Sequence, residues 1–178
     1  MKKELRRYFI NNRKKIPKND KKNWDEKIKN KLIKSEYYKN AKSIFIYYST
    51  EDEIDTKKII KQAFLDKKEV YIPKIIGKHT MVPVLLKSFD DLVYGKYKIK
   101  TSKLKNTKEN IDLTIVPGLS FDKNKYRLGY GGGFYDYYIK NHKSFYLGLF
   151  YQINKSYKLN FDKFDQKLDL VITDKNIY

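Results

Sequence analysis

A short glycine-rich segment in the second half of the chain has the composition of a phosphate-binding site. Residues 129–133 hold four glycines, and Arg127 and Asp136 stand on either side of them. A backbone without Cβ atoms can bring its N–H groups close to an anion. Arginine can bind a phosphate through two parallel hydrogen bonds, and a carboxylate is a hard oxygen ligand suited to Mg²⁺. These residue types at this spacing indicate a site for a phosphate and a metal ion.

The glycine-rich segment lies between a predicted strand and a predicted helix. Leu113–Val116 is a short apolar run rich in β-branched residues, which is typical of a buried strand. Tyr135–Asn141 has amphipathic spacing, and the N-terminus of a helix after a glycine loop favours phosphate. The segment matches neither the P-loop pattern nor the usual dinucleotide-binding spacing. On its own, a tight turn between strand and helix explains the glycines about equally well.

Five more apolar runs predict the other strands of a sheet: Ser43–Tyr48, Val70–Pro73, Met81–Leu86, Phe145–Tyr151 and Leu168–Thr173. Pro83 confines its strand to an edge or a bulge. Residues 89–110 are rich in lysine and weakly patterned, so we expect a surface excursion there. Strands that alternate with helices predict one α/β domain over residues 1–178. We expect a layered sandwich with a mostly parallel or mixed central sheet flanked by helices.

The predicted helices are amphipathic. Lys2–Lys15 forms the first, with cations flanking its apolar stripe. Asp20 is expected to cap the second helix, and Asp55 or Thr56 to cap a third. Trp24, Ile28 and Leu32 form the buried stripe of the second helix. A basic helix face such as that of the first helix is most often a solvated surface.

Two loops are expected to meet at one edge of this sheet. Ser49–Glu53 follows one predicted strand, and the glycine-rich segment follows another. In open α/β sheets, ligands bind beyond the carboxyl ends of the strands. The two loops are therefore candidates for a shared ligand site, although an isolated loop acid such as Glu53 more commonly faces water.

The composition excludes several classes of protein. The chain has no cysteine, which excludes disulfides and thiolate metal sites. It also has no run of 18 apolar residues and no apolar stretch behind its charged N-terminal residues, so we expect neither a membrane span nor secretion. A cytoplasmic location is the expectation that follows.

The net charge of +19 and the 16% aromatic content raise an alternative, a nucleic-acid-binding module. The charge is mostly lysine and accompanies many Asn, Ile and Tyr residues, a bias that codon composition can produce. No RNA-recognition motif, zinc knuckle or helix-turn-helix pattern is visible. We therefore treat the charge as a modifier of function and expect no nucleic-acid partner.

Longer motifs resemble those of one family. Pro117-Gly-Leu-Ser-Phe-Asp122 followed by Arg127-Leu-Gly-x-Gly-x-Gly-Phe-Tyr-Asp136 is similar to the signature of the 5-formyltetrahydrofolate cyclo-ligases, also called 5,10-methenyltetrahydrofolate synthetases. Near the N-terminus, Lys2, Leu5 and Arg6 match the family's Lys-x-x-Leu-Arg. Near the C-terminus, Asp165 and Asp169 resemble its Asp-x-x-x-Asp element. The resemblance extends over essentially the whole chain.

The resemblance implies an ATP-driven cyclisation of 5-formyltetrahydrofolate to 5,10-methenyltetrahydrofolate, with release of ADP and phosphate. It also implies ATP as a co-substrate and Mg²⁺ as the cofactor. The folate substrate can carry a polyglutamate tail. A monomer without membrane partners is expected.

The resemblance also implies a set of site residues. ATP is expected to bind at Lys2, Lys3, Arg6, Arg127, Leu128, Gly129, Tyr130, Gly131, Gly132, Gly133, Phe134 and Tyr135. Arg127 is the expected catalytic residue and neutralises phosphate charge. The folate is expected at Tyr48, Glu53, Met81 and Tyr130, although Met81 is equally well explained as a core residue. Asp136 and Asp165 are the expected magnesium ligands.

Overall fold

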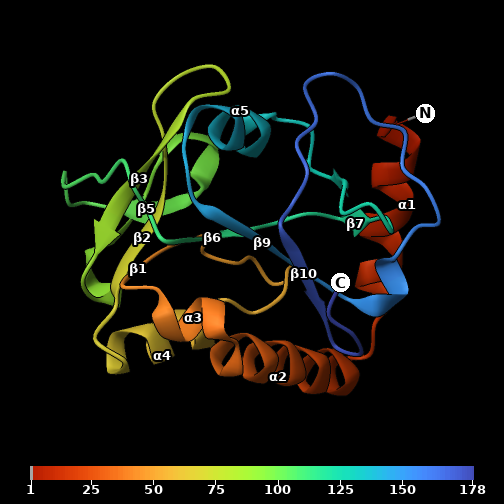
Figure 1. The fold of residues 1–178 in the computed structure, drawn as a ribbon, viewed down its shortest axis with the longest axis horizontal. Helices are drawn as coiled ribbons and strands as arrows, with labels where there is room; N and C mark the ends of the chain where they lie inside the picture. Colours follow the sequence, from red (N-terminus) through yellow and green to blue (C-terminus); the bar gives the residue numbers. More distant parts are fainter. Residues whose placement is uncertain (1) are drawn as a thin grey trace.

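A six-stranded sheet crosses the centre of the computed structural model, which describes residues 2–178 (Figure 1). Its strand order is β10-β9-β6-β1-β2-β3. The strands are β1 (Ser43–Ile46), β2 (Glu69–Ile75), β3 (Met81–Leu86), β6 (Leu113–Val116), β9 (Phe145–Phe150) and β10 (Leu170–Thr173). Neighbouring strands are parallel except β2 and β3, which are antiparallel. The predicted α/β sandwich is confirmed, and Pro83 lies on the edge strand β3.

Helices cover both faces of the sheet: α1 (Lys2–Lys14), α2 (Lys18–Lys34), α3 (Glu36–Asn40), α4 (Lys57–Leu65) and α5 (Phe134–Asn141). In Figure 1, α2, α3 and α4 lie on one face, α5 lies on the other, and α1 stands at the side next to β7 (Ser120–Phe121). Within residues 2–178, no helix has the length and apolar character needed to cross a membrane.

The sheet separates two hydrophobic clusters. Because strand side chains alternate between faces, Ile44 and Ile46 of β1 pack with Ile28 of α2, whereas Phe45 packs with Tyr138 of α5. The predicted buried stripe of the second helix is confirmed, since Ile28 and Leu32 are fully buried and Trp24 packs against the same cluster.

The start of α2 corrects one prediction. The helix begins at Lys18, directly after Pro17, and Asp20 lies in its first turn. Asp20 is therefore not the cap that the sequence predicts. Proline is well suited to a helix start because its missing N–H needs no partner there.

Residues 89–110 are more ordered than the sequence predicts. They contain η1 (Phe89–Asp91), β4 (Leu92–Tyr94), η2 (Lys96–Lys98) and β5 (Lys100–Ser102). The two strands form an antiparallel hairpin. Ser88 and Asp91 form a capping box at η1, and Thr101 and Ser102 are buried. Strands of three residues are too short to give a clear alternating pattern.

We predict that Gly148→Ala lowers the free energy of unfolding. Gly148 lies in β9 between Val116 and Val171 of the neighbouring strands. A Cβ there would lie 2.5 Å from Cδ1 of Leu168 and 2.5 Å from the Phe150 ring. Overpacking of this kind costs about 1–3 kcal/mol. Urea denaturation measures the change.

Gly77→Ala is the matched control, because its Cβ would come no closer than 3.6 Å to Thr80. Its expected effect is within about 0.5 kcal/mol of zero. If Gly148→Ala lowers the free energy of unfolding as little as this control does, small shifts of the neighbours relieve the crowding around Gly148.

Candidate active site

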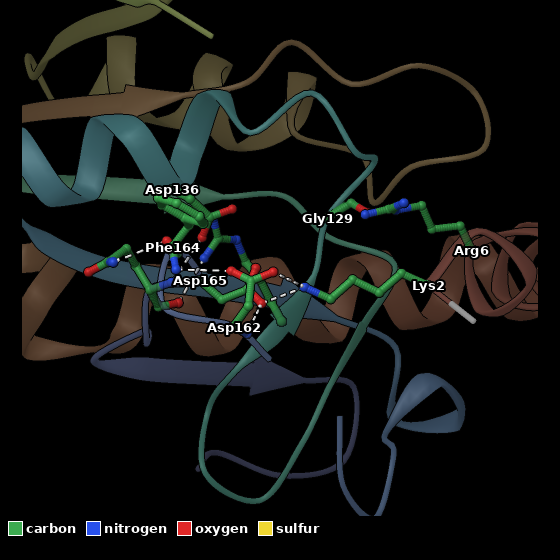
Figure 2. Close-up of polar contacts among 9 residues, drawn as sticks. Lys2, Arg6, Gly129, Asp136, Asp162, Phe164 and Asp165 are labelled. Carbon is green, nitrogen blue, oxygen red and sulfur yellow. Dashed lines mark hydrogen bonds and ion pairs between the residues drawn. The ribbon is translucent and has the colours of Figure 1, made fainter. Parts of the chain in front are cut away.

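The helix α1 packs across the glycine-rich segment. Phe9 forms a small hydrophobic cluster with Leu119, Leu128 and Leu159. The guanidinium of Arg6 donates from Nε to the carbonyl oxygen of Gly129 over 2.9 Å. Lys2 and Arg6 both point from α1 toward the site in Figure 2. The expected basic face of this helix therefore meets the glycine-rich segment.

The backbone of the glycine-rich segment requires glycine at two positions. Gly131 has φ +103° and Gly133 has φ +69°, a region that other residues rarely adopt. A Cβ on Gly131 would lie 3.3 Å from the guanidinium carbon of Arg6. The glycines therefore allow both the turn into α5 and the close approach of α1.

His79 also contacts this segment, a contact that no sequence pattern predicts. The connection between β2 and β3 passes beside α5 (Figure 1). From it, Nδ1 of His79 donates to the carbonyl oxygen of Gly132 over 2.5 Å. The His79 ring also contacts Phe134, with 6.3 Å between ring centres. The segment is thus held from two sides, by α1 and by His79.

Arg127 lies beneath the segment, and its side chain is only 2% exposed. Its Nη2 forms an ion pair with Oδ1 of Asp136 at 3.0 Å, and its Nη1 donates to the carbonyl oxygen of Gln166 at 3.0 Å. Burial lowers the pKa of Arg127, although the charge of Asp136 acts in the opposite direction. Both ends of the guanidinium are therefore occupied by protein acceptors.

A second group of charges joins α1 to the loop before β10. Lys2 Nζ lies 2.6 Å from Oδ2 of Asp165 and 3.0 Å from Oδ2 of Asp162 (Figure 2). Burial lowers the pKa of Lys2, but the hydrogen bonds and charges of the two aspartates outweigh this effect and leave that pKa raised. Lys2 is therefore a firmly charged ammonium.

Asp136 and Asp165 lie at the same corner of the molecule. The backbone N–H of Gln166, the residue after Asp165, donates to Oδ1 of Asp136 over 3.0 Å. Within the described part of the chain, Asp136 Oδ2 and Asp165 Oδ1 accept no hydrogen bond. No group of three or more His, Cys, Asp or Glu side chains suited to a metal occurs in residues 2–178.

This donor set fits Mg²⁺. The ion favours oxygen ligands, keeps several waters and is commonly held by one or two carboxylates together with substrate phosphates. Asp136 and Asp165 can supply the carboxylates.

A pocket of about 170 Å³ opens beside the glycine-rich segment. Its lining residues are Ile10, Arg13, Lys14, Thr50, Asp52, Glu53, Leu119 and Tyr130. Oε2 of Glu53 accepts a hydrogen bond from the backbone N–H of Thr50 at 2.8 Å. Tyr130 is 47% exposed, but partial loss of water around its hydroxyl and the nearby Glu53 charge raise the pKa of Tyr130, while Arg13 acts in the opposite direction. The two loops expected to meet at the sheet edge thus share one pocket.

Four other candidates lie outside this pocket. Tyr48 contacts the ring of Phe89, and Met81 is buried in the cluster around Phe45. The Tyr135 hydroxyl is buried and has no hydrogen-bond partner among the described residues, whereas Lys3 is exposed.

Comparison with known proteins gives a consistent result. The model of the 5-formyltetrahydrofolate cyclo-ligase family matches residues 1–174. The chain is 31% identical over 160 residues to the probable 5-formyltetrahydrofolate cyclo-ligase of Schizosaccharomyces pombe, covering 79% of this chain and 78% of that protein. For the Mus musculus 5-formyltetrahydrofolate cyclo-ligase, identity is also 31% over 160 residues, with coverage of 80% and 78%.

Solved structures agree with these relatives. The NMR structure of the Aquifex aeolicus 5,10-methenyltetrahydrofolate synthetase is 26% identical, with a TM-score of 0.89 over 99% of this chain and 91% of that one. The Mycoplasma pneumoniae 5,10-methenyltetrahydrofolate synthetase is 24% identical and supports the fold, with a TM-score of 0.78 over 97% of this chain and 98% of that one. These comparisons give no support to the nucleic-acid-binding alternative.

We predict that Asp136→Asn lowers the free energy of unfolding at neutral pH. The substitution leaves the buried guanidinium of Arg127 without its carboxylate. Breaking a fully buried pair costs about 3–5 kcal/mol, and the partial exposure of Asp136 reduces this to about 1–3 kcal/mol. Chemical denaturation provides the measurement.

Asp165→Asn is the matched control for this experiment. Its partner Lys2 is partly exposed, so the expected loss is about 1 kcal/mol or less. If Asp136→Asn were as stable as the control, the Arg127 pair would not be a structural requirement.

Proposed function

The chain belongs to the 5-formyltetrahydrofolate cyclo-ligase family, and on this premise we propose that it converts 5-formyltetrahydrofolate and ATP to 5,10-methenyltetrahydrofolate, ADP and phosphate. One observation supports this proposal most strongly. The glycine-rich segment, the basic face of α1 and the Glu53 loop converge at one edge of the sheet. A phosphate site and a pocket for a polar ring therefore adjoin each other, as a reaction between a nucleotide and a folate requires.

We assign the nucleotide to the glycine-rich segment. Backbone N–H groups of residues 129–133 and the cations of Lys2 and Arg6 can neutralise its phosphates. Asp136 and Asp165 would hold Mg²⁺, which neutralises phosphate charge when bound. Arg127 would act from beneath the segment, where its ion pair with Asp136 fixes that carboxylate.

The pocket beside the segment is the proposed folate site. Glu53 can accept hydrogen bonds from the N–H groups of the pterin ring, and Tyr130 closes the side next to the nucleotide. We also propose folate contacts outside this pocket, at Tyr48 beside the cluster of Ile44 and at Met81 in the cluster of Phe45. The net charge of +19 would attract a polyglutamate tail.

The proposed chemistry relies on alignment and neutralisation of charge. The formyl oxygen attacks the γ-phosphorus and ADP leaves; N10 of the folate then attacks the formyl carbon. The C–O bond breaks, and the oxygen departs with the phosphate. Phosphoryl transfer of this kind needs little covalent participation by the protein.

We further infer that the protein is a monomer and that it acts in the cytoplasm.

The direct test is the absorbance band of the methenyl-folate product. We expect it to grow when protein, Mg-ATP and 5-formyltetrahydrofolate are mixed. It should not grow without ATP or in excess EDTA, because phosphate charge would then lack its metal. Equal conversion in EDTA would contradict the magnesium assignment, and no conversion with Mg-ATP would contradict the proposed function.

Asp165→Asn should lower kcat by about tenfold or more, since it removes a charge that would hold the metal. Asp169→Asn is the control in the same loop. Oδ2 of Asp169 accepts the backbone N–H of Tyr146 at 2.7 Å, which is a structural contact. Calorimetric titration with Mg-ATP should show weaker binding only for Asp165→Asn. The reverse order would mean that Asp169 is the metal ligand.

A further inference from the structure

Arg13 is a buried cation in the pocket wall to which sequence reasoning assigned no role. It lies near the end of α1 and is only 5% exposed. Its Nη2 donates to the carbonyl oxygen of Gly118 at 2.6 Å, and its Nη1 donates to the hydroxyl of Tyr130 at 2.8 Å. Among residues 2–178, no carboxylate forms an ion pair with it. A guanidinium is costly to bury in this way, so its surroundings must hold it firmly.

A buried polar network supports Arg13 from below. Its guanidinium lies 5.9 Å from the ring centre of Tyr151. The Tyr151 hydroxyl donates to Asp25 at 2.6 Å, and Asp25 accepts a further bond from Lys21 at 2.8 Å. Because Asp25 and Tyr151 are buried, these contacts fix the ring on which Arg13 rests. The guanidinium is therefore held in one place.

The contact with Tyr130 has a fixed direction. Arginine has no acceptor, so the Tyr130 oxygen must accept the bond from Arg13. The Tyr130 hydroxyl then keeps its own proton, and it faces a pocket whose wall also contains the Glu53 carboxylate. Arg13 thus fixes the hydroxyl oxygen of Tyr130, and the proton of that hydroxyl is available to an acceptor in the pocket.

Tyr130 links two sites. Its neighbour Gly129 accepts the bond from Arg6, and the rest of its segment is glycine. Tyr130 is thus the one side chain within residues 129–133, and it faces the pocket that also contains Arg13 and Glu53.

We propose that Arg13 is a positioning residue for the folate. By holding the Tyr130 hydroxyl in the pocket wall that also contains Glu53, it sets the polar wall of the folate pocket and anchors the glycine-rich segment against that pocket. This inference rests on the proposed function, because it identifies the pocket as the folate site.

The test compares Arg13→Lys, Tyr130→Phe and the double variant. Lysine keeps the charge but cannot bond Gly118 and Tyr130 together in the same geometry. We expect each single substitution to raise KM for 5-formyltetrahydrofolate about tenfold. A change of this size is expected from the loss of one hydrogen bond to a charged group. KM for Mg-ATP should change less. The double variant should lie within about threefold of the worse single variant, because both substitutions remove the same contact.

Lys15→Gln is the matched control. It removes one positive charge close to Arg13, but Lys15 is exposed and does not line the pocket. We expect its KM for the folate to stay within about twofold of the wild-type value, as for an exposed charge. The Tm of every variant is measured alongside. A lowered Tm with unchanged KM in Arg13→Lys, or effects that multiply in the double variant, would overturn the proposal.

Direct binding separates this proposal from the proposed function. Calorimetric titration with 5-formyltetrahydrofolate, without ATP, needs no turnover. If the wild-type protein binds the folate but makes no product, the proposed function fails while the Arg13 comparison can still be made on Kd. Equal Kd values for the wild type and Arg13→Lys would overturn the positioning role, as would no binding to the wild type.

Discussion

Contacts between α1 and distant parts of the chain hold the candidate active site together. Arg6 and Arg13 bond to residues more than 100 positions away, and Lys2 pairs with Asp165 across a similar distance in sequence. The sheet supplies a rigid edge, but it brings only some loops to that edge. The charged face of α1 fixes the glycine-rich segment against the pocket, so a helix outside the sheet determines the geometry of the site.

The charges of this site neutralise one another. Lys2 is matched by Asp162 and Asp165, and Arg127 by Asp136. A bound phosphate must therefore compete with the Gly129 carbonyl for Arg6 and with Asp165 for Lys2. Lys2 would exchange a carboxylate for a phosphate and so keep a partner of opposite sign, whereas Arg6 would exchange a neutral carbonyl for a charged group.

Local patterns predicted the sheet well, because each strand is a short apolar run and Pro83 marks the edge. They also predicted the stripe of Ile28 and Leu32, which depends only on helical spacing. They failed where an outcome depends on distant partners. No spacing rule indicates that Arg127 is buried against Asp136, that His79 reaches Gly132, or that Arg13 reaches Gly118. The predicted start of α2 is wrong because Asp20 and Pro17 are both typical of a helix start, and the helix begins directly after Pro17.

The position of α1 also affects how the chain folds. Its partners lie within residues 118–165, so α1 leaves the ribosome long before they do and cannot dock until most of the chain has been made. Until then its apolar residues, including Phe9, have no surface to cover. Because α1 lies outside the sheet and depends on these contacts, it should also detach from the folded protein at lower free energy than the strands. Completion of the site therefore waits for the docking of a helix made early onto a segment made late.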